Sequence, residues 1–433
     1  MPRPHASPSP APPRSRTVRI LIGVLYLIAI CGLIVWEFRD HMDTLSAECK
    51  TTDSDPKPPL FSVPYNWLLR WTSAESSDQV SVVAIPNDLD VVQKNICLGR
   101  SYLSDLLRSI AAQHPSEIVV DKFFGPTTCT AFPETTAELL GSVQSLNIPI
   151  VVGESTAQIT EAKDDACLVR KPQLAFDTPY LHHGLTRLNF DPEKVPLHWR
   201  VLATAGDTKA QSADSLALAA VKAYDPAYIQ RPRIQRLINT AWDPYANLNF
   251  ELPRQTSTQL LCDTGSPDLK KRWTLDCSGP DPHNNLAGKI VIVGSEDPFD
   301  RRPVLNKNMW GFDLQARYIQ VLLSGRYLHA LPFKVAFSVF ALFIFVIEGV
   351  PTLLESYRPH LRKHPLFSRA FKQRRYVWVI FWMIAFILVC TVISLFFGYL
   401  PPLVVFGDIL LVVFTRLLFF AAESTANPLL HSK

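Results

Sequence analysis

The chain has 433 residues, a formal net charge of +4 and a slightly positive mean hydropathy. Soluble enzymes rarely have a positive mean hydropathy, and a small net charge without a basic stripe argues against nucleic-acid binding. The apolar residues concentrate near the start and after residue 330, a distribution typical of a globular domain anchored in a membrane.

The first apolar block, 20–36, carries no charge and follows Arg14, Arg16 and Arg19 in a Pro- and Ser-rich leader over residues 1–19. A block of about 17 apolar residues just spans a bilayer. A cleavable signal peptide is the alternative interpretation, but its small-residue cleavage motif is missing. We therefore expect a disordered cytoplasmic leader and an uncleaved membrane helix.

Residues 37–330 are predicted to form one α/β domain. Apolar runs indicate strands at 79–85, 117–123 and 148–153, and apolar residues at helical spacing indicate helices at 103–110 and 139–146. This β-α-β-α-β order predicts a mainly parallel sheet with right-handed crossovers and helices on its faces.

The rest of the domain shows weaker patterns until its end. A buried strand at 289–295 and a closing helix at 314–322 are clear, whereas a strand at 195–203 and a helix at 215–224 are less so. Residues 226–285 look loop-rich, and we expect the variable or partner-facing part of the domain there.

Three further apolar blocks, at 331–350, 376–397 and 401–421, are predicted membrane helices. The loop 351–375 is strongly basic, and short loops of this kind stay in the cytoplasm. The domain 37–330 then lies outside and the tail 422–433 inside, as expected for a multi-pass protein of a bacterial inner membrane with a large periplasmic domain.

The polar residues within these predicted spans include Glu348, Thr391, Asp408 and Arg416. Ionisable groups at such depths are costly unless they are paired or hydrated. Thr391 sits at the depth of Asp408, and Glu348 and Arg416 both fall toward the cytoplasmic side. We expect either an ion pair between Glu348 and Arg416 or an Arg416 side chain that reaches the interface alone.

Six of the eight cysteines lie in the predicted outside segment, where an oxidising compartment permits disulfides. Connectivity does not follow from spacing alone. We predict Cys262 with Cys277, which are close in sequence, and Cys97 with Cys129, whose loops leave the same edge of the predicted sheet.

Several segments together resemble the CHASE type-two extracytoplasmic sensor domain. They are the first strand, the helix from Arg100 with its Leu-Leu pair, the VVDKFF strand end and, above all, residues 286–328 with Asp300, Pro303, the Gly311 turn and Ala316. The resemblance implies an N-terminal span, a sensor and C-terminal helices in the order seen here. Gln315 stands where that family tends to have His.

Polar residues follow the predicted strands, and ligands of open α/β sheets bind beyond the carboxyl ends of strands. They form either a small polar pocket or a set of helix caps and ion pairs, with Asp121 and Asp300 capping helices or pairing with Arg100 and Arg301. The candidate ligand-binding residues are Asn87, Asp88, Arg100, Asp121, Ser295, Asp300 and Arg301.

Catalytic, cofactor and metal motifs are missing from the sequence. No G-x-S-x-G elbow, Walker-type phosphate loop or H-E-x-x-H occurs. His182, His183 and His198 lack a carboxylate at suitable spacing, so a surface loop is the better interpretation than a metal site. We expect neither enzymatic activity nor a cofactor nor a metal.

Proteins with this sensor usually continue into a cytoplasmic cyclase or kinase, whereas this sequence ends at the tail 422–433. We therefore expect a non-enzymatic sensor or accessory subunit that relays a periplasmic signal through its membrane helices to a separate partner. Expected partners are the lipid bilayer, other membrane or periplasmic proteins and a cytoplasmic signalling protein, but no nucleic acid. The cytoplasmic docking candidates are Arg362, Lys363, Arg374 and Arg375.

A structural scaffold of a multiprotein envelope complex is the main alternative function, with 226–285 as its contact surface. Transport is a weaker alternative, prompted by Asp408 and Arg416, because three or four helices without a repeat make a poor carrier.

Overall fold

A computed structural model describes the larger part of the domain between the predicted spans. The described residues are 75–76, 78–87, 96–124, 133–157, 167–169, 178–188, 194–202, 209, 211–232, 234–235, 243–246, 248–278, 284–297, 300–304, 307–325, 327–328, 388–389 and 392.

The centre of the domain is a six-stranded sheet in which every neighbouring pair is parallel. Its inner strands are buried on both faces and are rich in Val and Ile, as parallel sheets require. In sheet order the strands are β12 (Arg254–Thr256), β2 (Val80–Ile85), β13 (Ile290–Ser295), β3 (Glu117–Phe123), β4 (Ile150–Glu154) and β7 (Leu181–Leu185).

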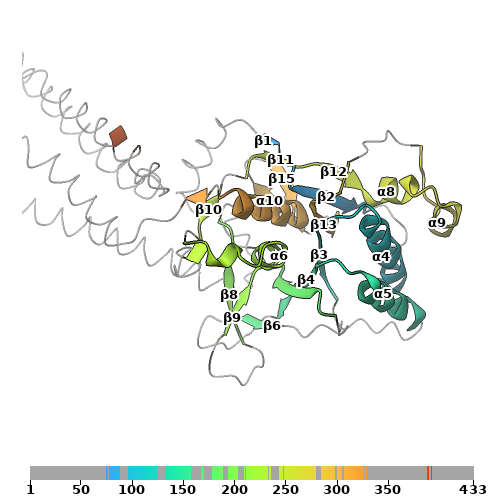
Figure 1. Cartoon of the computed structure of the whole chain (residues 1–433), viewed down its shortest axis with the longest axis horizontal. Helices are drawn as coiled ribbons and strands as arrows, with labels where there is room; N and C mark the ends of the chain where they lie inside the picture. The colour runs from blue at the N-terminus through green and yellow to red at the C-terminus, as the bar shows by residue number, and fades with distance from the viewer. Residues whose placement is uncertain are drawn as a thin grey trace, which may run out of the picture.

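Helices cover both faces of this sheet (Figure 1). The first face, called here the α4 face, packs against α4 (Ile96–Ala111), α5 (Pro133–Ser145), α8 (Ser257–Asp263) and α9 (Pro267–Trp273). The opposite face, called here the α10 face, packs against α6 (Leu216–Tyr224) and α10 (Gly311–Ser324). Alternate residues of each strand therefore enter two separate apolar cores.

Smaller sheets lie around this centre. A four-stranded sheet contains β5 (Thr156–Ala157), β6 (Cys167–Val169), β8 (His198–Leu202) and β9 (Gln211–Asp214), and a hairpin joins β14 (Arg301–Val304) to β15 (Lys307–Trp310). The short pairs are β1 (Glu75–Ser76) with β11 (Phe250–Glu251) and β10 (Tyr245–Ala246) with β16 (Tyr327–Leu328), and η1 (Tyr228–Gln230) is a short 3₁₀ helix.

The predicted α/β fold and mainly parallel sheet are confirmed, but the loop-rich interpretation of 226–285 is wrong in part. Within that range β12 forms one edge of the main sheet by pairing with β2, and α8 and α9 pack on the α4 face. A strand of three residues and helices of seven are too short to give a periodic signal.

No helix in the described part of the chain combines the length and apolar character that a membrane crossing requires. The predicted spans lie outside the described residues, except for Leu388, Val389 and Val392. The polar candidates Glu348, Thr391, Asp408 and Arg416 and the docking candidates Arg362, Lys363, Arg374 and Arg375 also lie outside them.

Candidate functional site

The carboxyl ends of the parallel strands form one edge of the sheet, and α10 begins at this edge. A Cβ atom on Gly294, near the end of β13, would lie 2.3 Å from the Cβ and Cγ of Phe312. Glycine at this position thus lets the first turn of α10 pack directly on the strand. The free N–H groups at the start of α10 therefore lie close to the loop after β13, which contains Asp297 and Asp300.

Asp300 caps α10. The backbone N–H of Gly311 donates to its carboxylate, and a Cβ on Gly311 would lie 2.3 Å from Asp300 Oδ2. Burial raises the pKa of Asp300; Arg302 opposes that rise, Asp297 adds to it, and the Gly311 N–H lowers the pKa again. Burial is the largest of these effects, so Arg302 and the Gly311 N–H offset only part of the cost of ionising this half-buried carboxyl group.

Asp121, near the end of β3, is the most perturbed carboxyl group at this edge. Burial raises its pKa to about 8, the charge of Asp300 adds to the rise, and Lys122 partly opposes it. Burial also lowers the pKa of Lys122, against the opposing effects of Asp297 and Asp121. A pKa of about 8 favours the protonated form of Asp121 at neutral pH, in which its carboxyl group can donate a hydrogen bond beside the Lys122 side chain.

These four residues, Asp121, Lys122, Asp297 and Asp300, are called here the carboxyl-edge cluster. Together their carboxyl and amino groups provide hydrogen-bond donors and acceptors, and a few such groups at one place can recognise a small polar ligand. The sequence placed Asp121 and Asp300 at this edge, and the structure brings them close enough for the charge of Asp300 to raise the pKa of Asp121.

A second network connects β12 to α10 beside the cluster. The guanidinium of Arg254 pairs with Glu296 and, at 2.5 Å, with Asp313 in the first turn of α10, and it lies 5.4 Å from the Phe312 ring centroid. Burial raises the pKa of Asp313, with Arg254 opposing. Sequence reasoning missed Arg254 because it fell in the segment interpreted as loop.

Gln315 adds an unused acceptor one turn further along α10. Its side chain is fully buried and Nε2 donates to the Thr186 carbonyl at 3.1 Å, whereas Oε1 has no hydrogen-bond partner among the described residues. Thr186 in turn donates through Oγ1 to the Glu154 carbonyl at 3.1 Å. Buried polar atoms normally have hydrogen-bond partners, so this oxygen is an exception that lowers the stability of the fold.

The remaining candidates are spread around and away from the cluster. Ser295 ends β13 opposite Ile85, and Arg301 is exposed with its guanidinium 4.0 Å from the Trp310 ring centroid. Arg100 belongs to the α4 face, where it is buried and donates to Thr136 Oγ1 at 2.6 Å. Of the two expected roles of Asp300, the helix cap is the one observed, at the start of α10, and Arg302 is the arginine that lowers its pKa.

Two candidates from the first loop complete this set. Asn87 lies in a half-buried turn two residues beyond β2, at the same edge of the sheet as the cluster. Asp88 lies outside the described residues.

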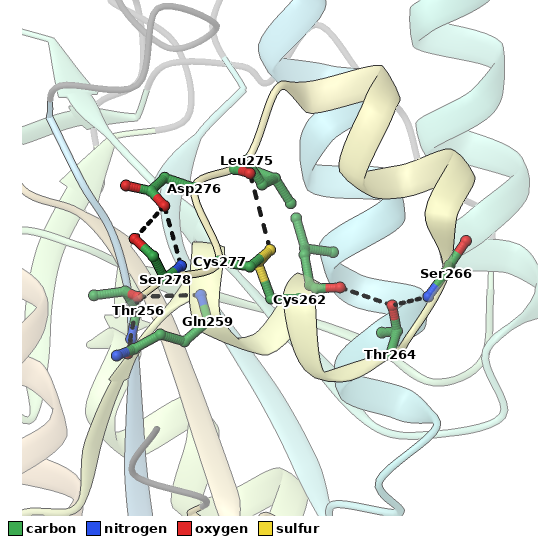
Figure 2. Close-up of a disulfide and its surroundings, with 10 residues drawn as sticks. Thr256, Gln259, Cys262, Thr264, Ser266, Leu275, Asp276, Cys277 and Ser278 are labelled. Atoms are coloured by element: carbon green, nitrogen blue, oxygen red, sulfur yellow. Dashed lines mark hydrogen bonds between the residues drawn. A yellow bond between two sulfur atoms is a disulfide. The ribbon is translucent and has the colours of Figure 1, made fainter. Parts of the chain in front are cut away.

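A disulfide joins Cys262 to Cys277, the pair that sequence proximity predicts, with Cα atoms 5.7 Å apart. It connects the end of α8 to the segment that follows α9 (Figure 2). Cys129 lies outside the described residues, so the pairing of Cys97 with Cys129 stays a prediction.

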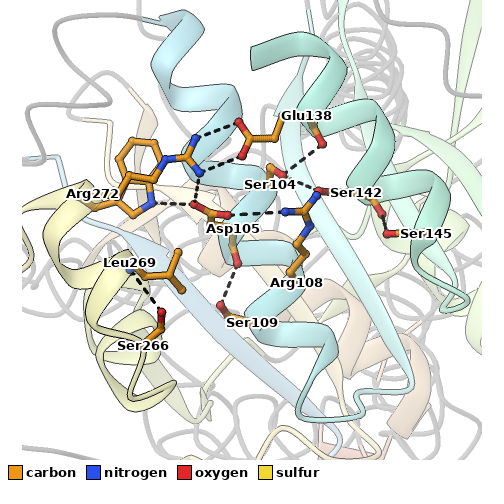
Figure 3. A network of polar contacts seen from close by, with 11 residues as sticks. Ser104, Asp105, Arg108, Ser109, Glu138, Ser142, Ser145, Ser266, Leu269 and Arg272 are labelled. Atoms are coloured by element: carbon orange, nitrogen blue, oxygen red, sulfur yellow. Dashed lines mark hydrogen bonds and ion pairs between the residues drawn. The ribbon is translucent and has the colours of Figure 1, made fainter. Parts of the chain in front are cut away.

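Helix α9 is fixed to α4 and α5 by a group called here the α9 clamp: Asp105, Glu138, Arg272 and Trp273 (Figure 3). Arg272 donates to both Glu138 oxygens at 2.9 and 3.0 Å and to Asp105 at 3.1 Å, and Trp273 Nε1 donates to Asp105 at 2.9 Å. The hydrogen bonds from Arg272 lower the pKa of Glu138. Every charge in this group has a partner.

The family model of the CHASE2 domain matches residues 56–350. The chain belongs to the CHASE2 family. CHASE2 domains are extracytoplasmic sensor domains rather than catalytic ones, which supports a sensing role for this chain. No curated protein and no solved structure matches it.

Two histidines of this CHASE2 domain each contact one carboxylate. His183 Nδ1 lies 3.5 Å from Glu154 and His198 Nδ1 lies 3.0 Å from Asp214. His182 and His183 belong to the edge strand β7 and His198 begins β8, so the surface-loop interpretation is wrong for all three. Within the described residues, no three His, Cys, Asp or Glu side chains are placed to hold a metal ion.

Proposed function

We propose that this protein is a non-enzymatic receptor of a bacterial inner membrane. Its CHASE2 domain lies outside the cell membrane, the carboxyl-edge cluster receives the signal, and membrane helices relay it to a separate partner. A small polar ligand or a periplasmic protein is the input. The receptor contacts the bilayer, a neighbouring membrane protein and, at the basic loop 351–375, a cytoplasmic partner.

The cluster is the observation that carries this proposal. Ionisable groups whose pKa values are strongly shifted, as burial raises those of Asp121 and Asp300, are concentrated at functional sites. Here they lie at the carboxyl ends of parallel strands, the position where open α/β sheets bind their ligands. Gln315 Oε1 adds a buried acceptor under the same helix.

Helix α10 offers a route for the signal. It starts at Gly311, whose N–H donates to Asp300, and ends at Ser324, shortly before β16 and the predicted span 331–350. A ligand that displaced the Asp300 carboxylate from the Gly311 N–H would change how α10 docks on the sheet. Because α10 packs against α6, β2 and β13, a small shift at its start can favour one of two packed arrangements.

The outside placement has two supports, the disulfide between Cys262 and Cys277 and the basic loop 351–375. Alkaline phosphatase fused after residue 330 is expected to be active, and the same reporter fused after residue 375 inactive. The reversed pattern would place the domain in the cytoplasm and end the proposal.

Purification of the full-length chain in mild detergent separates the receptor from the scaffold. A receptor is expected to purify without a stoichiometric partner and to melt at a higher temperature when a periplasmic small-molecule extract is added. A constant stoichiometric partner together with a melting temperature insensitive to the extract would favour the envelope scaffold instead.

A further inference from the structure

A second unusual carboxyl group lies at the opposite edge of the sheet from the cluster. Glu117 is the first residue of β3, and its side chain has no exposed surface. In the sheet register it pairs with Ile290, which pairs with Val80, and both of these side chains belong to the core of the α10 face. Val119, two residues along β3, is in the same core, so Glu117 points into apolar packing.

Neither carboxylate oxygen of Glu117 has a hydrogen-bond partner among the described residues. Burial alone raises the pKa of this carboxyl group well above its ordinary value. An ionised carboxylate in apolar surroundings is far more costly than the neutral acid, so the folded domain favours the protonated form.

The helix that packs on β3 from this face is α6. Its two titratable side chains are directed elsewhere: Lys222 donates to Asp214 at 2.6 Å, and Tyr224 is 38% exposed. Residue 215, which caps α6, bridges to Leu185 at the carboxyl end of β7, so α6 ends at the edge where Glu117 lies. The negative end of the helix dipole disfavours a carboxylate further.

The neighbouring strands also offer no cation. The one ionisable residue of β4, Glu154, lies at the opposite end of that strand, and β13 contains none. Lys289 directly precedes Ile290 and has the opposite parity, which directs its side chain to the α4 face. Among the described residues of β4, β13 and α6, the elements packed against β3, none gives Glu117 a counter-charge.

We propose that Glu117 is a pH-sensitive switch for the packing of α6 on the sheet. In the folded domain it is a neutral acid; when the pH rises, its proton passes to water and the resulting carboxylate loosens α6 beside the end of α10. The stability from the neutral form is fully present below the unfolded-state pKa and is lost as pH rises through the folded-state pKa. The inference concerns the edge opposite the ligand site and does not depend on it.

The test compares the melting temperature of the full-length chain in mild detergent with that of Glu117→Gln between pH 4.5 and 8.5. The two are expected to melt alike at pH 4.5. Above it, the variant is expected to melt higher by about 3 °C for each pH unit until the folded-state pKa is reached. Glu138→Gln is the matched control: Arg272 lowers the pKa of Glu138, so this variant is expected to lose stability as pH rises.

Hydrogen exchange places the effect in the structure. After correction for the intrinsic rate, the amides of residues 216–224 are expected to exchange faster at pH 8 than at pH 5 in the natural chain and equally at both in Glu117→Gln. A melting difference that stays the same at every pH, or a variant less stable throughout, would overturn the proposal. Ligand retention by this variant is expected to be unchanged, which separates it from the receptor proposal.

Discussion

The α9 clamp and the carboxyl-edge cluster use the same residue types in opposite ways. In the clamp, Asp105 is 6% exposed and accepts hydrogen bonds from Arg272 and Trp273, and Glu138 has a lowered pKa. In the cluster, the pKa of Asp121 is raised to about 8. Both regions bury a carboxyl group. They differ in the hydrogen-bond donors that reach it, because Arg272 and Trp273 donate to Asp105 in the clamp.

This difference separates a region that holds the fold together from one that is available for binding. Removing one partner from a buried charge network whose members are all paired is strongly destabilising, and such a network leaves nothing for a ligand to satisfy. Carboxyl groups that burial makes costly to ionise, as in the cluster, reduce the stability of the free domain and are the usual cost of a functional site. The two regions are therefore expected to respond to substitution with opposite signs.

The largest effect is expected in the segment that the clamp holds. Replacing Cys262 and Cys277 by Ser opens the loop between them, and closing a loop of about 15 residues contributes roughly 3 kcal/mol. Denaturant unfolding of the full-length chain measures this loss. Reduction of the natural chain is expected to give the same loss, and no change on reduction would contradict it.

Asp105→Ala is expected to cost about 2 kcal/mol, because it leaves the buried Trp273 N–H without its acceptor and removes one partner of Arg272. The same unfolding measurement applies. Glu134→Gln on the exposed first turn of α5 is the control and is expected to change little. If the two variants were equally stable, the clamp would not contribute to stability.

Asp121→Asn is expected to have the opposite sign. The folded-state pKa is about 8 and the ordinary value lies near 3.9, so the natural residue loses stability as pH rises between them. At pH 7 the variant is expected to be more stable by about 1–2 kcal/mol, a value reduced for water that reaches this half-buried group. The gain vanishes near pH 4, and a variant less stable at pH 7 would show that Asp121 is fully paired.

The smallest effect belongs to the start of α8. Thr256 Oγ1 accepts from the Gln259 N–H at 3.2 Å, and Gln259 Oε1 accepts from the Thr256 N–H at 3.0 Å (Figure 2). Thr256→Ala removes this cap and is expected to cost about 1 kcal/mol in thermal unfolding. Thr256→Ser keeps the hydroxyl and is expected to restore most of it; equal losses in both variants would exclude capping as the cause.

Long periodic elements could be predicted from the sequence, and elements fixed by tertiary pairing could not. Strand β3 was predicted at the observed bounds, and Ser215 at the start of the predicted helix 215–224 caps α6. Strand β12 is three residues long and exists because it pairs with β2, which no local pattern reveals.

The candidate site follows the same division. Asp121 and Asp300 were predicted because the carboxyl ends of parallel strands share one edge. For Arg100 the structure shows a hydrogen bond to Thr136 on α5, a partner that the rotation of α4 decides and that no sequence pattern reveals. Glu117 gave no signal, because an acidic residue at the start of a strand is usually exposed.

Ligand retention tests the central claim most directly. The full-length chain, Asp300→Asn and Glu134→Gln are incubated in mild detergent with a periplasmic small-molecule extract, and retained compounds are identified by mass spectrometry. The account predicts a polar compound held by the natural chain and by Glu134→Gln but lost from Asp300→Asn. Retention of the same compounds by all three proteins, or of none by the natural chain, would contradict a sensing site at the carboxyl edge.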